Sequence, residues 1–270
     1  MPRYFIEVSY KGTAYSGFQI QKNGITIQSE VEKALTIYFK RPFSLTGSSR
    51  TDAGVHALQN FFHFDVEQPL IENDNSHQPQ TSKVSSFAGH LSIDKAGLGQ
   101  ASYHLNAILP KDIVIKKIFQ VDEDAHCRFD AISREYKYYI YWNKDPFLQD
   151  RAYYFPYHLD KGKLKEAATV LLGNKDFTSF SKRNTQVNNF ICTLQKSEWL
   201  TEGNRMYYCV KGNRFLRGMV KGLVGTMLKV GTGKISLDEL NTVITSKDCA
   251  QADFSVPSHA LFLVEVGFTL

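Results

Sequence analysis

Two hydrophobic periods alternate along this sequence, and they constrain its fold more than any other feature does. Residues 4–10 alternate apolar with polar side chains, which is the period of a β-strand that buries one face. From Ile27 onward the apolar residues recur every three or four positions, which predicts an amphipathic helix capped by Thr26. Strand spacing returns at residues 44–47 and 59–66. We therefore expect the chain to open with strand, helix and strands.

The second half of the chain repeats this succession of strands and helices. The spacing predicts strands at 113–119, 133–141, 190–199, 206–211 and 262–268, and helices at 159–172, at 215–227 and from the capping box Ser236–Glu239. A succession repeated in two halves favours an α+β protein of two lobes, each a mainly antiparallel sheet with helices on one face. The expected lobes are residues 1–112 and 113–270, and the cleft between two lobes is the default place for a site.

Residues 69–100 interrupt the first lobe with a different composition. The stretch is dominated by Ser, Asn, Gln, Gly, Asp and Pro, and Phe87 is its only aromatic residue. Such a segment has too little apolar surface to fold by itself. We expect it to be a mobile insertion that is dispensable for folding.

Composition bounds the class of protein. A chain of 270 residues with 43% hydrophobic residues can bury a large core, which excludes the disordered and fibrous classes. The formal net charge of +5 suits a polyanionic partner without requiring one. No run approaches the roughly 18 apolar residues of a membrane span, and the amino terminus lacks a signal-peptide pattern, so we expect a cytoplasmic protein. The cysteines are scattered without a Cys-x-x-Cys pair, which indicates neither a zinc site nor a disulfide framework.

The polar stretch 50–57 lies between two predicted strands. Gly54 permits a tight turn there, and composition alone makes Asp52 a simple turn-capping residue in a solvated loop. A metal site would need Asp52, His56 and His63 to converge, but no fourth ligand follows at a suitable spacing. The residue pattern by itself therefore favours the loop.

The predicted strand at 133–141 carries four tyrosines. Alternation places on one of its faces the side chains of Arg134, Tyr136, Tyr138 and Ile140. Aromatic side chains with interleaved cations hold unpaired nucleotides in many proteins, although a tyrosine-rich strand is also simply a stable strand. Both interpretations stay open at this point.

A basic stripe follows the predicted helix over 215–227. Arg214, Arg217 and Lys221 are spaced at i, i+3 and i+7, which places them on one side of the helix. Three glycines in the same segment each cost about 1 kcal/mol relative to alanine, and they are Gly218, Gly222 and Gly225. We expect something to approach this helix closely, whether its basic face is functional or merely solvated.

The stretch 50–57 resembles the RTDAGVHA signature of the tRNA pseudouridine synthase A family, and other motifs of that family follow in order. They lie in both halves of the chain, at residues 9–19, 104–110, 128–136, 176–180 and 213–220. Only residues 69–100 lie outside the resemblance. It implies two α/β lobes around a basic cleft that binds RNA, in a homodimer that needs neither cofactor nor metal.

The resemblance also implies a reaction, the isomerisation of uridine to pseudouridine at positions 38–40 of the tRNA anticodon stem-loop. The bond between uracil N1 and C1′ breaks, the base is reoriented, and a bond between C5 and C1′ forms. Carried over by motif, Asp52 is the essential carboxylate, either a nucleophile at C1′ or a base at C2′. Arg50 helps to expel the target base from its stack, and Tyr136 stacks on the uracil near C5.

One residue departs from the family pattern, because Lys221 stands where the family has arginine after Met-Val. A basic group there would pair with Asp52 and keep the carboxyl ionised, and lysine supplies the charge without arginine's two-pronged geometry. Arg217 could substitute for it or contact phosphate, and Arg214 and Arg134 are further candidates for binding RNA.

Two alternatives remain beside the isomerase. The departure at Lys221 would suit a catalytically silent RNA-binding protein that uses the same cleft and aromatic residues. A metal-dependent hydrolase built on Asp52, His56 and His63 would be favoured only if chelation abolished activity.

Overall fold

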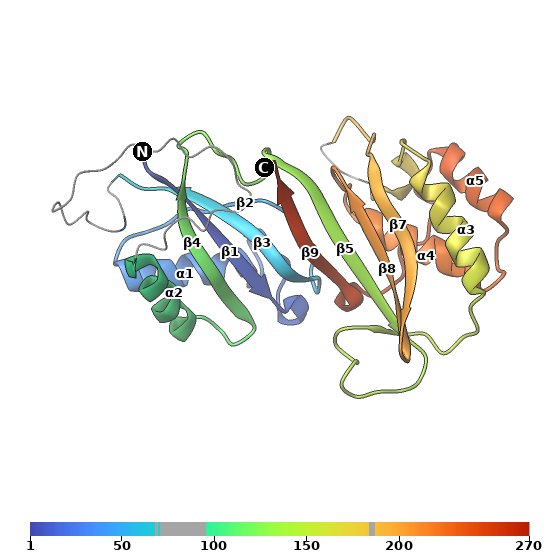
Figure 1. Cartoon of the computed structure of the whole chain (residues 1–270), viewed down its shortest axis with the longest axis horizontal. Coiled ribbons are helices and arrows are strands. Elements are labelled where there is room, and N and C mark those ends of the chain that lie inside the picture. Colours follow the sequence, from blue (N-terminus) through green and yellow to red (C-terminus); the bar gives the residue numbers. More distant parts are fainter. Residues whose placement is uncertain (68–69, 71–95, 184–186, 270) are drawn as a thin grey trace. The chain divides into compact units, whose positions relative to one another are not determined.

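The computed structural model describes residues 1–67, 70, 96–183 and 187–269, and it has the α+β composition that the sequence predicts (Figure 1). The strands are β1 (Arg3–Tyr10), β2 (Thr46–Gly47), β3 (His56–Asp65), β4 (Ile113–Val121), β5 (Ala131–Tyr141), β6 (Tyr153–Tyr154), β7 (Leu194–Glu202), β8 (Arg205–Gly212) and β9 (Leu261–Phe268). The α-helices are α1 (Ile27–Phe39), α2 (Ala96–Ile108), α3 (Lys161–Leu172), α4 (Met219–Gly231) and α5 (Leu237–Ser246), with short 3-10 turns at Gly12–Ala14, Thr178–Phe180 and Ser258–Ala260. Within these ranges no helix is long and apolar enough to cross a membrane.

The chain divides into two compact units. The first comprises Met1–Thr51, Ala57–Ile132 and Val266–Leu270, and the second comprises Asp52–His56 and Ser133–Glu265. The first unit extends beyond the boundary expected at residue 112, because β4 pairs with β1 along its whole length. The short stretch that contains Asp52 groups with the second unit rather than the first, since Val55 is buried in that unit's core.

In the first unit, β1 is the central strand. It pairs antiparallel with β3 on one side and β4 on the other, and β2 extends the sheet along β3. Helix α1 begins with a capping box, in which Thr26 and Ser29 exchange side-chain and backbone hydrogen bonds, so the predicted cap is confirmed. Its buried residues include Val31 and Leu35, which follow the predicted three-to-four spacing.

Helix α2 corrects the expected extent of the polar insertion. The composition places residues 96–100 in that insertion, but they form the first part of α2, and Leu98 in that part is only 6% exposed. Asn106 attaches the helix to β4, because its amide group both donates to and accepts from the backbone of Ile115 at 2.8 Å. The rest of the expected insertion, apart from residue 70, lies outside the described residues.

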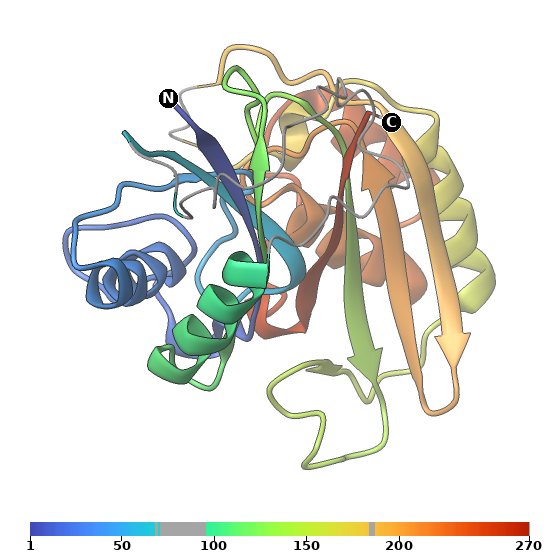
Figure 2. The ribbon, with the colours of Figure 1, turned by 60° about the vertical axis from the view of Figure 1, so that its left-hand side comes forward.

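In the second unit, the strands follow the order β9-β5-β8-β7, and β6 pairs with β5. Tyr136 lies opposite Val210 and Tyr138 lies opposite Tyr208, so these four positions share one face. Tyr138 and Ile140 are fully buried in the core with residues of α3, α4 and α5. The predicted alternation along this strand is confirmed, and Figure 2 shows the three helices on one side of β5, β8 and β7.

Helix α4 begins later than the sequence predicts. Gly218, the residue before it, has a φ of 73°, a left-handed conformation that breaks the helical path. Arg214 and Arg217 therefore lie in the segment that precedes the helix, and only Lys221 of the predicted basic stripe is on α4.

The expected close approach to α4 comes from the chain itself. A Cβ atom on Gly222 would lie 2.8 Å from the ring of Phe254, and one on Gly225 would collide with the backbone carbonyl of Asp253. These two glycines therefore admit the segment at 253–254 against the helix. Their cost in helix propensity has a packing explanation within the second unit.

Candidate functional site

Asp52 opens a tight turn that its neighbours hold in place. The Val55 N–H donates to the Asp52 carbonyl oxygen at 3.2 Å, and Gly54 has a φ of 81°, which a turn of this kind requires at its third position. Val55 is 3% exposed in the core of the second unit. The His56 Nε2–H faces two carbonyl oxygens, that of His259 at 2.8 Å and that of Asp150 at 3.0 Å. The partly exposed Asp52 carboxylate is thus carried by an anchored turn.

Tyr136 lies within electrostatic reach of this carboxylate. Burial raises the pKa of its hydroxyl to about 12, Arg134 opposes the rise, and the negative charge of Asp52 adds to it. The ring packs edge to face against Phe215. The Tyr136 hydroxyl therefore stays protonated at neutral pH and remains able to donate a hydrogen bond.

Lys221 is the third member of this neighbourhood. Burial and the nearby charge of Lys182 lower the pKa of its ammonium group, and Asp52 opposes that effect. The Lys221 Nζ donates a hydrogen bond to Ser258 Oγ at 3.2 Å. No ion pair within 4.0 Å joins Lys221 to Asp52 among the described residues. The expected interaction between Lys221 and Asp52 is therefore electrostatic at longer range.

The four arginines predicted to bind RNA lie in different environments. Arg134 Nη1 donates to the Asn213 carbonyl oxygen at 3.1 Å, which ties β5 to the segment before α4. Arg217 is exposed, and Arg214 is close enough to Cys192 for its charge to lower the pKa of that thiol, although burial of the thiol outweighs it. Arg50 is exposed and belongs to the first unit.

Sequence reasoning missed two residues that contact this neighbourhood. Lys182 lays its aliphatic stem over Gly218, where a Cβ atom would lie 3.0 Å from Lys182 Cγ, and its backbone N–H donates to the Arg217 carbonyl oxygen at 3.0 Å. It follows the motif at 176–180 by two residues, which was the available signal. Ser258 lies in an ordinary Pro-Ser-His stretch that carries no signal of its own.

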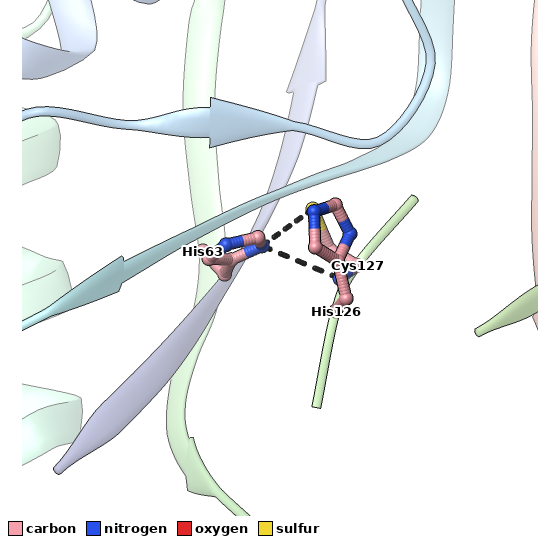
Figure 3. Close-up of side chains that lie close together, drawn as sticks. All are labelled: His63, His126 and Cys127. Carbon is pink, nitrogen blue, oxygen red and sulfur yellow. Dashed lines mark hydrogen bonds between the residues drawn. The ribbon is translucent and has the colours of Figure 1, made fainter. Parts of the chain in front are cut away.

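The one group of three potential metal-ligating side chains in the described part of the chain contains neither Asp52 nor His56. It consists of His63, His126 and Cys127, whose candidate ligand atoms lie within 4.8 Å of one another (Figure 3). His56 instead bonds to backbone carbonyl groups. The three ligands of the hydrolase alternative are therefore not gathered.

Hydrogen bonds join two members of the group in Figure 3, and the third member bonds to the backbone of its own turn. His63 Nδ1 lies 3.2 Å from Cys127 Sγ and accepts the Cys127 N–H at 3.3 Å. His126 Nδ1 accepts the backbone N–H groups of Arg128 and Phe129 at 3.1 and 3.3 Å. Burial lowers the pKa of His63 to about 4, so its ring is neutral. The Nδ1 lone pairs of His63 and His126 thus already accept hydrogen bonds from the protein. The role of the group in the fold is to join β3 to the turn that starts at His126.

Comparisons with known proteins point to one family. The sequence model of tRNA pseudouridine synthase matches residues 6–130 and 167–269, which include Asp52 and Lys221 but leave Tyr136 between the two matched segments. A protein of Parabacteroides distasonis named tRNA pseudouridine synthase A is 42% identical over 268 residues, which cover 99% of this chain and 96% of the relative. Proteins of the same name are 41% identical over 267 residues in Bacteroides fragilis, with 98% and 96% covered, and 34% over 266 residues in Staphylococcus aureus strain Newman, with 98% and 90% covered.

Proposed function

The chain belongs to the tRNA pseudouridine synthase family, and from this we propose that it modifies the anticodon stem-loop of tRNA at positions 38–40. It is an isomerase that converts uridine to pseudouridine in tRNA. The choice of positions rests on the resemblance of its motifs. The observation that carries the proposal is the neighbourhood of an anchored carboxylate, a protonated tyrosine and a lysine, namely Asp52, Tyr136 and Lys221.

Asp52 is proposed as the group that acts on the sugar. The isomerisation needs an anionic oxygen near C1′ and C2′, either to attack the anomeric carbon or to take the C2′ proton. A carboxylate on a partly exposed turn can reach the sugar of a nucleotide whose base has been turned out of its stack. The anchoring of Val55 in the core and of His56 on two carbonyl groups fixes the backbone of the turn that carries this carboxylate.

Tyr136 is proposed to serve two steps with two parts of its side chain. Its ring offers a surface on which the uracil stacks, and stacking on an aromatic residue holds a turned-out base. Its hydroxyl is protonated at neutral pH, because burial raises its pKa to about 12. The hydroxyl can therefore hold a water molecule near C5 of the uracil. The proton on C5 must leave before the product becomes aromatic.

Lys221 is proposed to keep Asp52 ionised through its charge. The arginines at 50, 134, 214 and 217 are proposed to contact RNA, with Arg50 helping to expel the base and the exposed Arg217 contacting phosphate. We further propose that the protein acts as a homodimer in the cytoplasm, without an added cofactor, as the resemblance implies. Light scattering of the purified protein measures its oligomeric state.

Release of tritium from C5 tests the proposed function. Purified protein is incubated, with no added cofactor, with an unmodified tRNA transcript that carries [5-³H]uridine, and released tritium is counted. A matched transcript with cytidine at positions 38–40 and uridine elsewhere is the control. We expect release from the first transcript alone. Equal release from both would contradict the assigned positions, and binding without release would favour the silent RNA-binding protein.

A further inference from the structure

The segment Pro257–His259 is fixed by hydrogen bonds on both sides of its central residue. The Tyr138 hydroxyl, from the buried face of β5, donates to the Pro257 carbonyl oxygen at 2.9 Å. The His56 Nε2–H, from the turn that Asp52 opens, donates to the His259 carbonyl oxygen at 2.8 Å. Ser258, which starts the 3-10 turn before β9, is thus held between β5 and the turn that Asp52 opens.

Ser258 contacts both the Asp52 turn and Lys221. Its Cβ lies 3.3 Å from the position that a Cβ on Gly54 would occupy, so it packs directly against the turn. Its Oγ accepts the hydrogen bond of Lys221 Nζ at 3.2 Å. One small side chain therefore bridges the element that carries the carboxylate and the element that carries the ammonium group.

Lys221 depends on this contact for its place. A lysine side chain has four rotatable bonds and a point charge, so it does not fix its own direction as the planar fork of arginine does. No carboxylate lies within ion-pair distance of its Nζ in the described part of the chain, and the charge of Lys182 repels it. The charge of Asp52 acts against this repulsion, and the hydrogen bond to Ser258 is the short-range contact that places the ammonium beside the turn.

We propose that Ser258 is a positioning residue of the isomerase, whose hydroxyl holds the Lys221 ammonium at a fixed place beside the Asp52 turn. The proposal rests on the proposed function for its effect on turnover, and on the hydrogen-bond geometry alone for its effect on Lys221. Displacement of a functional group by about 1 Å can cost on the order of a hundredfold in rate. Ser258 touches neither sugar nor base in this assignment and acts only through Lys221.

The first test compares Ser258→Ala with Ser255→Ala. Ser255 is exposed, lies three residues earlier, and bonds to Asp253 instead of Lys221, which makes it a matched control. We expect Ser258→Ala to lower kcat for tritium release about tenfold and to leave KM for tRNA within twofold, because phosphate contacts supply most of the affinity. The control is expected to retain the wild-type kcat. A wild-type kcat in Ser258→Ala would overturn the proposal.

A double-mutant cycle separates positioning from general damage to the fold. In a Lys221→Ala background, Ser258→Ala has no ammonium left to hold, so we expect it to change kcat by less than twofold. If the second substitution lowered kcat tenfold again, Ser258 would act independently of Lys221 and the proposal would fail. Thermal midpoints of all variants are measured alongside the rates.

A readout that needs no turnover keeps this inference distinct from the proposed function. The pKa of Lys221 is measured in the free protein by side-chain NMR of ¹³C-labelled lysine, with Lys221→Arg identifying the resonance. Loss of an acceptor that favours the charged form should shift this pKa downward in Ser258→Ala and leave it in place in Ser255→Ala. An unchanged pKa would overturn the contact, whereas a wild-type protein that releases no tritium would contradict the proposed function alone.

Discussion

Tyr136 and Phe215 meet edge to face, with ring centroids 5.0 Å apart and ring planes at 78°. Aromatic pairs of this geometry contribute about 0.5–1.5 kcal/mol beyond the burial of their surfaces. Tyr136 comes from β5 and Phe215 from the segment before α4, so the contact links the two elements that carry the tyrosine and the basic residues. The orientation of the proposed stacking ring is thus set by protein contacts before RNA binds.

The ring and the hydroxyl of Tyr136 should be separable by mutation. We expect Tyr136→Phe to bind tRNA as well as the wild type does and to fail in turnover, because the oxygen near C5 is lost. Tyr136→Ala should also lose roughly 1–3 kcal/mol of base stacking. Filter binding over a salt series and tritium release measure the two effects, and the salt slope should be the same in all three proteins because phosphate contacts are untouched. Wild-type turnover in Tyr136→Phe would remove the hydroxyl from the chemistry.

Asp52→Asn should abolish pseudouridine formation while tRNA affinity stays within a few-fold. The loss should exceed the roughly 10²–10⁴-fold of a single proton-transfer contribution, because the carboxylate acts on the sugar itself. Tritium release and filter binding measure the two quantities. Asp122→Asn, an exposed carboxylate of the other unit, is the control. Residual turnover near that of the wild type would place the essential carboxylate elsewhere.

Substitutions of Lys221 should reveal whether its charge or its geometry limits the rate. Lys221→Arg is expected to keep or raise kcat, since it restores a planar, permanently charged group beside the turn. Lys221→Ala should lower kcat, because the Asp52 carboxylate loses a compensating charge that acts on it electrostatically. Steady-state tritium release compares the three proteins. Identical rates would shift attention to Arg217 as the partner of Asp52.

Lys182 should tune the pH at which Lys221 loses its proton. Its positive charge lowers the pKa of Lys221, so removing that charge in Lys182→Ala should raise this pKa. If turnover needs the ammonium form, the alkaline limb of the kcat profile should then move to higher pH. Lys175→Ala, at an exposed position of the same unit, should leave the limb in place. A shift to lower pH in Lys182→Ala would contradict the assignment.

Burial of Leu98 limits how much of the polar insertion can be deleted without loss of stability. Because Leu98 is buried in α2, Leu98→Ala should lower the free energy of unfolding by about 2–5 kcal/mol. Tyr103→Ala, at a site 74% exposed on the same helix, should have a much smaller effect. Urea denaturation measures both. A Gly-Ser linker that replaces residues 71–98 should therefore destabilise the protein, although the composition of the stretch predicted that it could be removed without loss.

Local signals were sufficient for the elements whose ends and faces are set by neighbouring residues. Thr26 and Ser236 cap their helices because their side chains reach a backbone N–H three residues on, a property of the sequence alone. The alternation in β5 likewise predicted that Tyr136 and Tyr138 share one face, since side chains of a strand point to opposite faces in turn. The motif around Asp52 identified the candidate carboxylate by resemblance.

Tertiary contacts account for what the sequence did not reveal. Helix α2 contains few large apolar residues and is attached to β4 through Asn106, which no periodicity predicts. The apolar spacing that begins at Phe215 continues into α4 and so predicts one continuous helix. The left-handed backbone of Gly218 instead makes the helix begin at Met219. Ser258 and Lys221 are 37 residues apart in the chain, and only the folded second unit brings them together.

The glycines of α4 influence the proposed chemistry without contacting the groups that carry it out. Replacing a helical glycine with alanine ordinarily stabilises a protein. At Gly225, however, the new methyl group would displace the Asp253 carbonyl and the segment that leads from it to Ser258. The displacement caused by such a substitution would thus reach, within five residues, the Ser258 hydroxyl that accepts the hydrogen bond of Lys221. Because the methyl group would clash with the Asp253 carbonyl, Gly225→Ala is expected to lower both heat tolerance and turnover, although no RNA contact is assigned to this position.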